Sequence, residues 1–267
     1  MRFMIFRAIW QACIPIAFAL LVSSCVTSSS EPYTLSTGPG LAMKVVQPRG
    51  GGPVETLVVL LHGDVSRGGP ADYMYSLASQ IARSGTNIAA AAIIRPGYYD
   101  SEGNRSPGDN NGRRDNATRA SNSAIANEIR RLRATFNAKH VVAMGHSAGA
   151  IAVGAIIARA PGLIDAAILV SCPCDIQRWR SMNDRRPRAI QSESPSKFVD
   201  LIPATTKVVA VTGSRDDNTY PSLAIKYVAS LQSRGLDARF VEVSGAGHGF
   251  RGLRETVRKE ILEAAKM

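Results

Sequence analysis

The stretch "VVAMGHSAGA", residues 141–150, places Ser147 between two glycines directly after a run of apolar residues. A Gly-x-Ser-x-Gly string also arises by chance, so the elements around it decide its meaning. The apolar run before Ser147 has the length of a buried strand, and 148–159 has a helical pattern. A serine on such a strand-to-helix turn has an exposed hydroxyl, and Gly145 and Gly149 leave room for the tight backbone.

The rest of the chain alternates apolar runs of strand length with segments of helical periodicity. Strands are predicted at 56–63, 87–96, 140–147, 165–172, 206–213 and 237–245, and helices at 71–84, 115–136, 148–159, 221–234 and 251–265. Near-continuous apolar strands are typical of a sheet covered on both faces, and this alternation favours parallel pairing. We expect an α/β fold with a mainly parallel central sheet, helices on both faces and a small insertion between Cys172 and Pro203.

A nucleophilic serine needs a base to take its proton, and histidine is the side chain that most often does so. The chain has four histidines. His146 adjoins the serine, His140 begins a strand, and His62 precedes the strand-to-helix turn of Ser147 in the chain. None of these three is therefore well placed to act on Ser147. His248 lies in "SGAGHGF" after the last predicted strand, where glycines on both sides free the loop to turn the ring inward. The sequence therefore predicts His248 as the general base.

The histidine in turn needs a carboxylate that fixes its tautomer. Asp216 and Asp217 lie in "VTGSRDDNT", on the loop that follows the predicted strand at 206–213. Asp175, in "CPCD", follows an earlier predicted strand and is a third candidate. The residues alone leave the choice among these three carboxylates open.

The order of serine, acid and histidine along the chain resembles that of the α/β-hydrolase superfamily, and the resemblance covers nearly all of 41–267. Within that superfamily, "SPSKFVDLIP" (194–203) and "GSRDD" (213–217) look like the prolyl-oligopeptidase and dienelactone-hydrolase branches. In those branches the first aspartate of such a pair is usually catalytic. The resemblance therefore implies the catalytic set Ser147, Asp216 and His248.

The same resemblance implies an oxyanion hole, a pair of backbone N–H groups that stabilises negative charge on the reacting carbonyl oxygen. "LLHGD" (60–64) is similar to the His-Gly element that follows an early strand in the superfamily. The implied donors are the N–H of Ala148 and the N–H of Asp64. The carboxylate of Asp64 departs from the pattern, because its charge opposes an oxyanion unless the side chain turns away.

The N-terminus has the layout of a secretory signal. Arg2 and Arg7 precede the apolar stretch "IPIAFALLV", which is too short for a membrane span. The following "LVSSC" (21–25) resembles the lipobox of bacterial lipoproteins, and this resemblance implies lipid attachment at Cys25. Val26, which is not aspartate, then favours the outer membrane.

These observations predict a signal peptide at 1–24, a flexible tether at 25–40 and a catalytic domain at 41–267. The tether is rich in Ser, Thr, Gly and Pro. We expect a protein of the bacterial cell envelope that is lipid-anchored in the outer membrane and faces the periplasm.

The formal net charge of +11 is compatible with an anionic membrane surface or with nucleic acid, and export argues against nucleic acid. The basic run 178–188 is interpreted as a solvated face, with acidic substrates or phospholipid head groups as the alternative. Trp179 within it is a candidate for a small lid that lines an acyl pocket.

No cofactor and no metal are predicted. Asp109 and Asp115 lie in a Gly- and Asn-rich loop, but no complete calcium-ligand pattern follows them. Cys172 and Cys174 supply too few ligands for a metal, and cysteines two residues apart form a strained disulfide. We therefore expect both cysteines to be free structural thiols.

The sequence as a whole favours a serine hydrolase that cleaves a small carboxylic ester through an acyl-enzyme. Two alternatives remain: a serine peptidase or amidase of the prolyl-oligopeptidase-like branch, and a non-catalytic binding lipoprotein on the same fold. The sequence does not determine the oligomeric state.

Overall fold

The computed structural model describes residues 40–183 and 189–266. The signal peptide, Cys25 and nearly all of the tether lie outside these residues, so those assignments stay predictions. Within the described residues, no helix is both long enough and apolar enough to cross a membrane.

The described residues form a seven-stranded sheet in the order β1-β3-β2-β4-β5-β6-β7. β1 pairs antiparallel with β3 at one edge, and the remaining strands are all parallel. The strands are β1 (Met43–Val46), β2 (Thr56–Leu61), β3 (Ile88–Ile93), β4 (His140–His146), β5 (Ala166–Val170), β6 (Lys207–Gly213) and β7 (Ala238–Val243).

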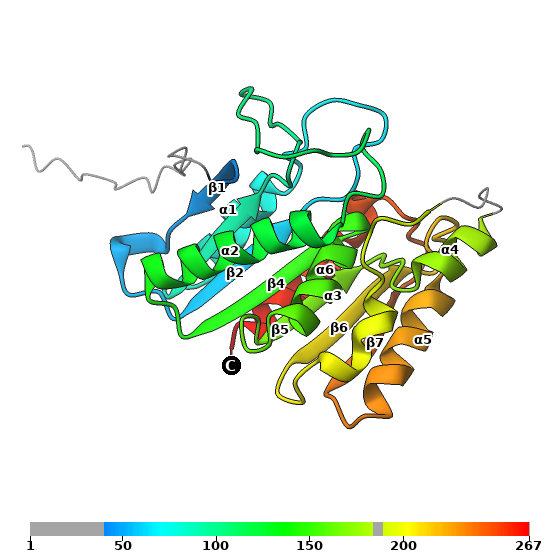
Figure 1. Cartoon of the computed structure of the whole chain (residues 1–267). Coiled ribbons are helices and arrows are strands. Elements are labelled where there is room, and N and C mark those ends of the chain that lie inside the picture. The colour runs from blue at the N-terminus through cyan, green and yellow to red at the C-terminus, as the bar shows by residue number, and fades with distance from the viewer. Residues whose placement is uncertain (1–39, 184–188, 267) are drawn as a thin grey trace, which may run out of the picture.

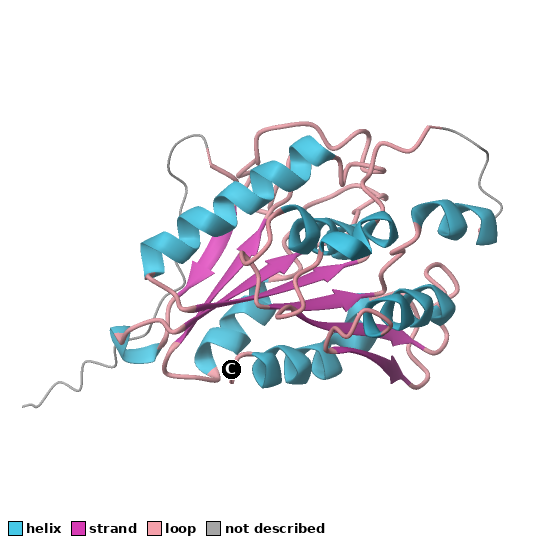
Figure 2. Ribbon diagram, turned by 60° about the horizontal axis from the view of Figure 1, so that its bottom comes forward, coloured by secondary structure: helices cyan, strands magenta, loops and turns pink. Residues whose placement is uncertain are grey.

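Helices cover both faces of this sheet, as Figures 1 and 2 show. α2 (Arg119–Phe136), α3 (Ala148–Arg159) and α5 (Pro221–Gln232) pack on one face, and α1 (Tyr75–Arg83) and α6 (Phe250–Ala264) pack on the other. The insertion carries the short helix α4 (Ile176–Met182) and the 3₁₀ helix η2 (Pro195–Leu201), and a further 3₁₀ turn, η1, spans Arg49–Gly51. The predicted α/β class with a mainly parallel sheet is confirmed.

Each of the six predicted strands contains a strand of the sheet, and four of the five predicted helices contain a helix. The fifth, at 251–265, begins one residue after the start of α6. The prediction missed β1, which has four residues and pairs only at the edge of the sheet. It also missed α4, which lies inside the insertion. Both elements are too short to produce a clear periodic pattern.

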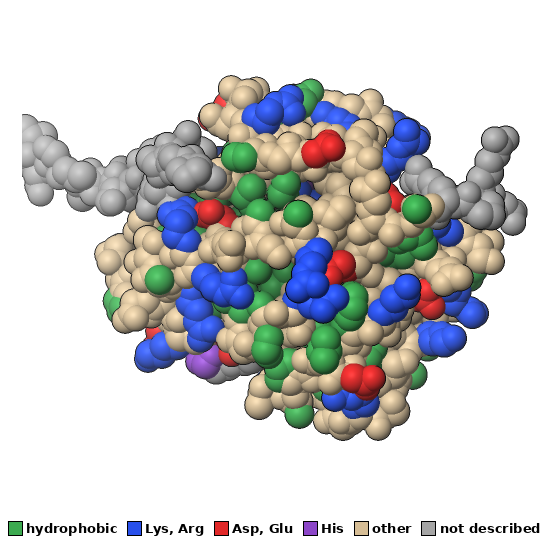
Figure 3. Space-filling model, in the orientation of Figure 1, with side chains coloured by type: hydrophobic (Ala, Val, Ile, Leu, Met, Phe, Trp, Pro, Cys, Tyr) green, Lys and Arg blue, Asp and Glu red, His purple; other side chains and the backbone are tan. Residues whose placement is uncertain are grey.

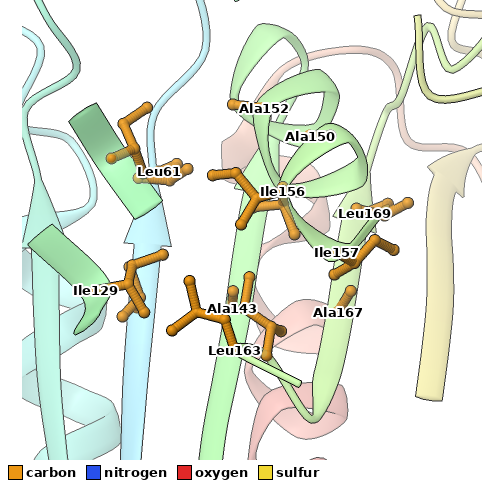
Figure 4. Packing of buried hydrophobic residues seen from close by; sticks show 14 of the residues in the cluster. Leu61, Ile129, Ala143, Ala150, Ala152, Ile156, Ile157, Leu163, Ala167 and Leu169 are labelled. Atoms are coloured by element: carbon orange, nitrogen blue, oxygen red, sulfur yellow. The ribbon is translucent and has the colours of Figure 1, made fainter. Parts of the chain in front are cut away.

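The core on the α3 face depends on small residues that let a helix lie close to the sheet. Every residue of α3 from Ala148 to Ala158 is buried. Figure 4 shows Ala150, Ile156 and Ile157 of α3 among Ala143 of β4 and other apolar side chains. This packing fixes the start of α3 firmly against the sheet.

Cys172 and Cys174 form a disulfide, so the prediction of two free thiols is wrong. The two Cα atoms lie 5.1 Å apart, which is within the ordinary range for disulfides. The expectation failed because it took a separation of two residues as unfavourable for a disulfide, whereas the local backbone brings the two cysteines within reach of each other.

On the face shown in Figure 3, Lys and Arg side chains are spread among Asp, Glu and uncharged groups. Positive charge therefore does not gather in one large patch on this face. Such dispersed charge is typical of an ordinary solvated surface.

The turn between β4 and α3 requires glycine at two positions. A Cβ atom at Gly145 would lie 2.2 Å from the carbonyl oxygen of Gly149. A Cβ atom at Gly149 would lie 2.6 Å from the carbonyl oxygens of both Leu61 and His62. The contacted atoms are backbone atoms that cannot rotate away, so the end of β2 and the start of α3 approach closely only because Gly149 has no side chain.

Gly149→Ala should therefore destabilise the fold by about 1–3 kcal/mol, because the added methyl group overlaps fixed backbone. The matched control is Gly252→Ala in α6, where the nearest atom, Cβ of Ala246, would lie at 3.5 Å. We expect the control to change the free energy of unfolding by less than about 1 kcal/mol. Urea unfolding measures both variants, and a Gly149→Ala protein as stable as wild type would contradict the close approach.

Candidate active site

Ser147 occupies a strained turn at the carboxyl edge of the sheet. Its φ and ψ are 54° and −116°, a conformation that a residue with a side chain rarely adopts. The surrounding backbone holds it there: the Ser147 N–H donates to the carbonyl of Val170 at 2.8 Å, and the Ser147 carbonyl accepts from the N–H of Ala150 at 2.9 Å. This is the geometry of a nucleophile elbow, which presents the hydroxyl outward.

His248 lies beside this hydroxyl, although it is distant in the sequence. Its Nε2 is 3.2 Å from the Oγ of Ser147. Its Nδ1 is 3.0 Å from Oδ2 and 3.2 Å from Oδ1 of Asp216. The structure thus brings the three predicted side chains into one chain of hydrogen bonds.

Asp216 is held as an ionised acceptor. Its Oδ1 accepts from the backbone N–H of Thr219 at 2.7 Å and of Asn218 at 3.1 Å, and its Oδ2 accepts from the hydroxyl of Thr219 at 2.7 Å. Burial opposes ionisation, but these hydrogen bonds and His248 outweigh it and lower the pKa of Asp216 to about 2. Asp216 is therefore charged throughout the physiological pH range.

The other two candidate carboxylates lie elsewhere. Asp217 is exposed, and within the described residues it makes no hydrogen bond to His248. Asp175 caps the start of α4, where its side chain accepts from the N–H of Arg178 at 3.0 Å. Of the three candidates left by the residues alone, only Asp216 contacts the histidine.

The two N–H groups predicted to form an oxyanion hole, those of Ala148 and Asp64, belong to residues that line the same cavity as Ser147. Across 40–183 and 189–266, neither N–H has a hydrogen-bond partner in the protein. Both donors are thus available to an oxygen atom in the cavity.

The carboxylate of Asp64 is paired, which answers the objection raised by its charge. Its Oδ1 accepts from Nη2 of Arg95 at 2.9 Å and from the hydroxyl of Tyr98 at 2.8 Å. The Arg95 side chain is almost fully buried and also donates to Asn116 and to the carbonyl of His62. The guanidinium of Arg95 therefore neutralises the carboxylate of Asp64.

His62 orients the peptide that carries the Asp64 N–H. The backbone N–H of Arg95 donates to Nε2 of His62 at 2.9 Å, so the proton of the neutral ring sits on Nδ1 and is donated to the carbonyl of Gly63 at 2.7 Å. Burial, reinforced by the charge of Arg95, holds the pKa of His62 well below its usual value. Because the Gly63 carbonyl and the Asp64 N–H share one peptide plane, fixing the first also fixes the second.

Tyr73 and His146 connect this loop to His248. The Tyr73 hydroxyl accepts from the N–H of Gly63 at 2.5 Å, so its own proton is free for Nδ1 of His146, 2.8 Å away. Nε2 of His146 then donates to the carbonyl of His248 at 3.0 Å. Burial, assisted by the nearby His248, lowers the pKa of His146 to about 4, so this ring is neutral near pH 7.

The cavity above Ser147 and His248 has a volume of about 570 Å³. Part of its lining is apolar and comes from Ile151, Pro173, Ile176 and Trp179, and part is charged and comes from Asp64, Arg113, Arg114, Asp115 and Arg180. Trp179, the lid candidate, is held in the lining by its indole N–H, which donates to the carbonyl of Asn218 at 2.8 Å. Nowhere in the described residues do three or more His, Cys, Asp or Glu side chains cluster as metal ligands do.

The family model for the prolyl oligopeptidase family matches residues 123–265, which is more than half of the chain. The chain belongs to the prolyl oligopeptidase family. The matched segment runs from α2 to α6 and includes Ser147, Asp216 and His248. No curated protein sequence matches the chain.

Solved structures similar to this chain include esterases of similar length and a longer peptidase. Esterase PE8 is 22% identical with a TM-score of 0.59, and the match covers 83% of this chain and 99% of that one. Est1E from Butyrivibrio proteoclasticus is 14% identical with a TM-score of 0.62, covering 88% and 99%. An acylaminoacyl peptidase from Pyrococcus horikoshii is 12% identical with a TM-score of 0.64, covering 88% of this chain and 40% of the peptidase. At these identities the likeness shows the shared fold.

Several residues that build this site were not predicted from the sequence. Thr219 holds Asp216, and Tyr73 bridges the loop of Gly63 to His146. The sequence predicts no function for His62 and His146, whereas in the structure both are neutral rings that hold neighbouring backbone groups. The sequence signals for these two residues are their positions: His146 directly precedes Ser147, and His62 belongs to the His-Gly element. No sequence pattern marks Tyr73.

The neutral histidines predict a pH dependence of stability. Because burial holds the pKa of His146 near 4, against 6.5 in an unfolded chain, the unfolded state binds more protons between these values. The free energy of unfolding should therefore fall as the pH drops from about 6.5 toward 4. The slope of this dependence is proportional to the difference in bound protons between the unfolded and folded states. His146→Gln, whose amide keeps a donor and an acceptor, should reduce that difference by up to about one proton.

Urea unfolding between about pH 7 and about pH 5, where most carboxylates stay ionised, measures the slope. The wild type and the variant are compared by the change of unfolding free energy with pH. A lower stability of the variant at every pH therefore does not affect the result. An equal slope in the wild type and in His146→Gln would show that His146 is not a buried neutral ring.

Proposed function

We propose that this protein is a serine hydrolase that cleaves carboxylic esters of small molecules. The observation that carries the proposal is the continuous set of contacts from Asp216 through His248 to the Ser147 hydroxyl, at the edge of a cavity. In this proposal Ser147 is the nucleophile, His248 is the general base and acid, and Asp216 fixes the tautomer of His248.

The reaction follows from these positions. The Ser147 Oγ attacks the ester carbonyl carbon while its proton moves to Nε2 of His248. Collapse of the tetrahedral intermediate breaks the bond to the alcohol, which leaves with that proton. Water then gives a proton to the same nitrogen and attacks the acyl-enzyme. The carboxylic acid departs as Ser147 recovers its proton, so no external oxidant, reductant or metal enters the balance.

The unpartnered N–H groups of Ala148 and Asp64 would stabilise the oxyanion in both halves of the reaction. Such donors act strongly because they are already oriented before charge develops on the oxygen. The ring of His62 and the hydroxyl of Tyr73 hold the loop that carries the Asp64 donor. Removing one oxyanion donor in comparable enzymes lowers the rate by about two to three orders of magnitude.

Two observations favour esters over peptides as substrates. The volume of about 570 Å³ suits a small molecule, and the apolar part of the lining is limited to a few side chains. The chain also matches nearly the whole length of the two esterases, and one structure of Est1E contains ferulic acid. The alternative is a peptidase or amidase, because the acylaminoacyl peptidases share the fold.

A series of p-nitrophenyl esters from acetate to palmitate, run beside aminoacyl and peptidyl p-nitroanilides, tests the substrate class. We expect kcat/KM to peak at a short or medium acyl length, because each added methylene gains about 0.8 kcal/mol only while it contacts the apolar wall. A peptidyl anilide or palmitate as the best substrate would contradict the esterase proposal.

Three variants assign that activity to the site. Ser147→Ala should lower kcat/KM by at least about three orders of magnitude, and Asp216→Asn should lower it almost as far, since the histidine tautomer is lost. Asp217→Asn makes the same change of charge one residue away and should stay within about threefold of wild type. Equal losses in the two aspartate variants would overturn the role given to Asp216.

We also propose that the enzyme is exported and lipid-anchored through Cys25 in the bacterial cell envelope, in the outer membrane facing the periplasm. The lipobox-like "LVSSC" and the polar segment after it support this placement. The Cys172–Cys174 disulfide is compatible with an oxidising compartment. The function as an esterase does not depend on the anchor.

Cys25→Ser should abolish lipid attachment, because a hydroxyl at this position does not accept the diacylglyceryl group that a thiol accepts. The variant should appear as an unprocessed precursor or as a released form, as measured by membrane fractionation and intact mass. Cys13→Ser serves as the matched control and should leave the mature mass unchanged. Normal membrane retention and mature mass in Cys25→Ser would contradict the anchor.

A further inference from the structure

One wall of the active-site cavity is a short segment with an unusual backbone. Asn111, Gly112, Arg113 and Asp115 all have positive φ angles, of 47°, 62°, 61° and 50°. Three of these residues carry side chains, for which this left-handed region is unfavourable. Such strain persists only where the surroundings hold it, and it concentrates at functional sites. The contacts of the segment show what it holds in place.

Arg113 anchors the segment on one side. Its Nη1 donates to the carbonyl of Val65 at 3.0 Å and to the carbonyl of Gly69 at 2.8 Å. Its guanidinium also lies over the rings of Tyr98 and Tyr99, at 5.5 Å and 5.3 Å from their centroids. The charge of Arg113 is therefore engaged with the protein itself.

Asp115 anchors the segment on the other side. Its carboxylate accepts from the backbone N–H groups of Gln191 at 3.1 Å and Ser192 at 3.0 Å. It also pairs with Nη2 of Arg180 at 3.1 Å, and only 6% and 8% of the two side chains are exposed. This buried pair neutralises Asp115 and ties the segment to the insertion.

Arg114 stands between these anchors and lines the cavity together with Ser147 and His248. It is exposed, and its guanidinium has no ion pair or hydrogen bond with any residue in the described part of the chain. The two carboxylates that line the cavity, Asp64 and Asp115, are already paired with Arg95 and Arg180. The charge of Arg114 is thus left uncompensated at the mouth of the site.

We propose that Arg114 binds an anionic group of the substrate, so that the enzyme prefers esters that also carry a free carboxylate. This inference rests on the proposed esterase function and narrows its substrate class. A guanidinium binds a carboxylate through two parallel hydrogen bonds, which gives orientation as well as attraction. The anchors at Arg113 and Asp115 hold the backbone of Arg114 in place, while the apolar lining accommodates the uncharged part of the substrate.

Two pairs of esters test this preference, and they differ in where the carboxylate lies. The first pair is 4-nitrophenyl hydrogen adipate and its methyl ester, which carry or mask a carboxylate on the acyl side. The second pair is 4-acetoxybenzoate and its methyl ester, which do the same on the leaving group. Rates are corrected for spontaneous hydrolysis, and the readout is the kcat/KM ratio of the anionic to the neutral ester within each pair.

We expect this ratio to favour the anionic ester in at least one pair and to fall about tenfold in Arg114→Gln. Arg114→Lys should recover part of the preference, because it keeps the charge but loses the two-pronged geometry. The matched control is Arg83→Gln, which removes the same charge from the exposed last turn of α1 and should leave the ratio unchanged. Higher ionic strength should reduce the preference, as expected for an exposed ion pair.

Calorimetric titration with adipate separates a failure of this inference from a failure of the esterase proposal, because binding needs no turnover. The affinity should fall about tenfold in Arg114→Gln and stay unchanged in Arg83→Gln. Ester hydrolysis with no Arg114-dependent ratio and no Arg114-dependent binding would overturn the role of Arg114 alone. Arg114-dependent binding without hydrolysis of any ester would keep the anion site and overturn the esterase proposal.

Discussion

The close approach of the start of α3 to the end of β2 is the constraint on which the rest of the site depends. It exists because Gly149 has no side chain where the carbonyl oxygens of Leu61 and His62 pass. The approach brings Ala148, at the start of α3, and Asp64, in the loop after β2, to the lining of one cavity. Ser147 directly precedes Ala148, so the candidate nucleophile and both candidate oxyanion donors lie next to the same contact.

Loops positioned by a rigid sheet still need to be held relative to one another, and buried neutral groups do this here. The ring of His62 fixes the Gly63 carbonyl, and Tyr73 joins the N–H of Gly63 to His146. His146 in turn holds the carbonyl of His248. A charged ring would lose one of these hydrogen bonds, so the low pKa values of the two histidines and their positioning roles have the same cause, which is burial.

Much of the fold was predictable because long apolar runs and helical periodicities are strong local signals, and all the parallel strands gave one. That Ser147, Asp216 and His248 lie together was predictable, because each follows a strand and their order along the chain resembles that of a known superfamily. β1 and α4 were not predictable, since short elements leave no periodic trace, and the Cys172–Cys174 disulfide was not, since the backbone conformation between two cysteines cannot be read from a local pattern. The contacts of Tyr73, and those of Arg113 and Asp115 on either side of Arg114, join segments distant in sequence, which no local pattern encodes.

The proposed mechanism requires Ser147 to be a nucleophile activated by its surroundings. Peptide mapping after reaction with a fluorophosphonate tests this requirement, because the tryptic peptide from His140 to Arg159 contains Ser147 as its only hydroxyl-bearing residue. We expect a single stoichiometric adduct on that peptide, lost when His248 is replaced by alanine, since the hydroxyl then has no base. An adduct on another peptide, or an unmodified 140–159 peptide after complete reaction, would contradict it.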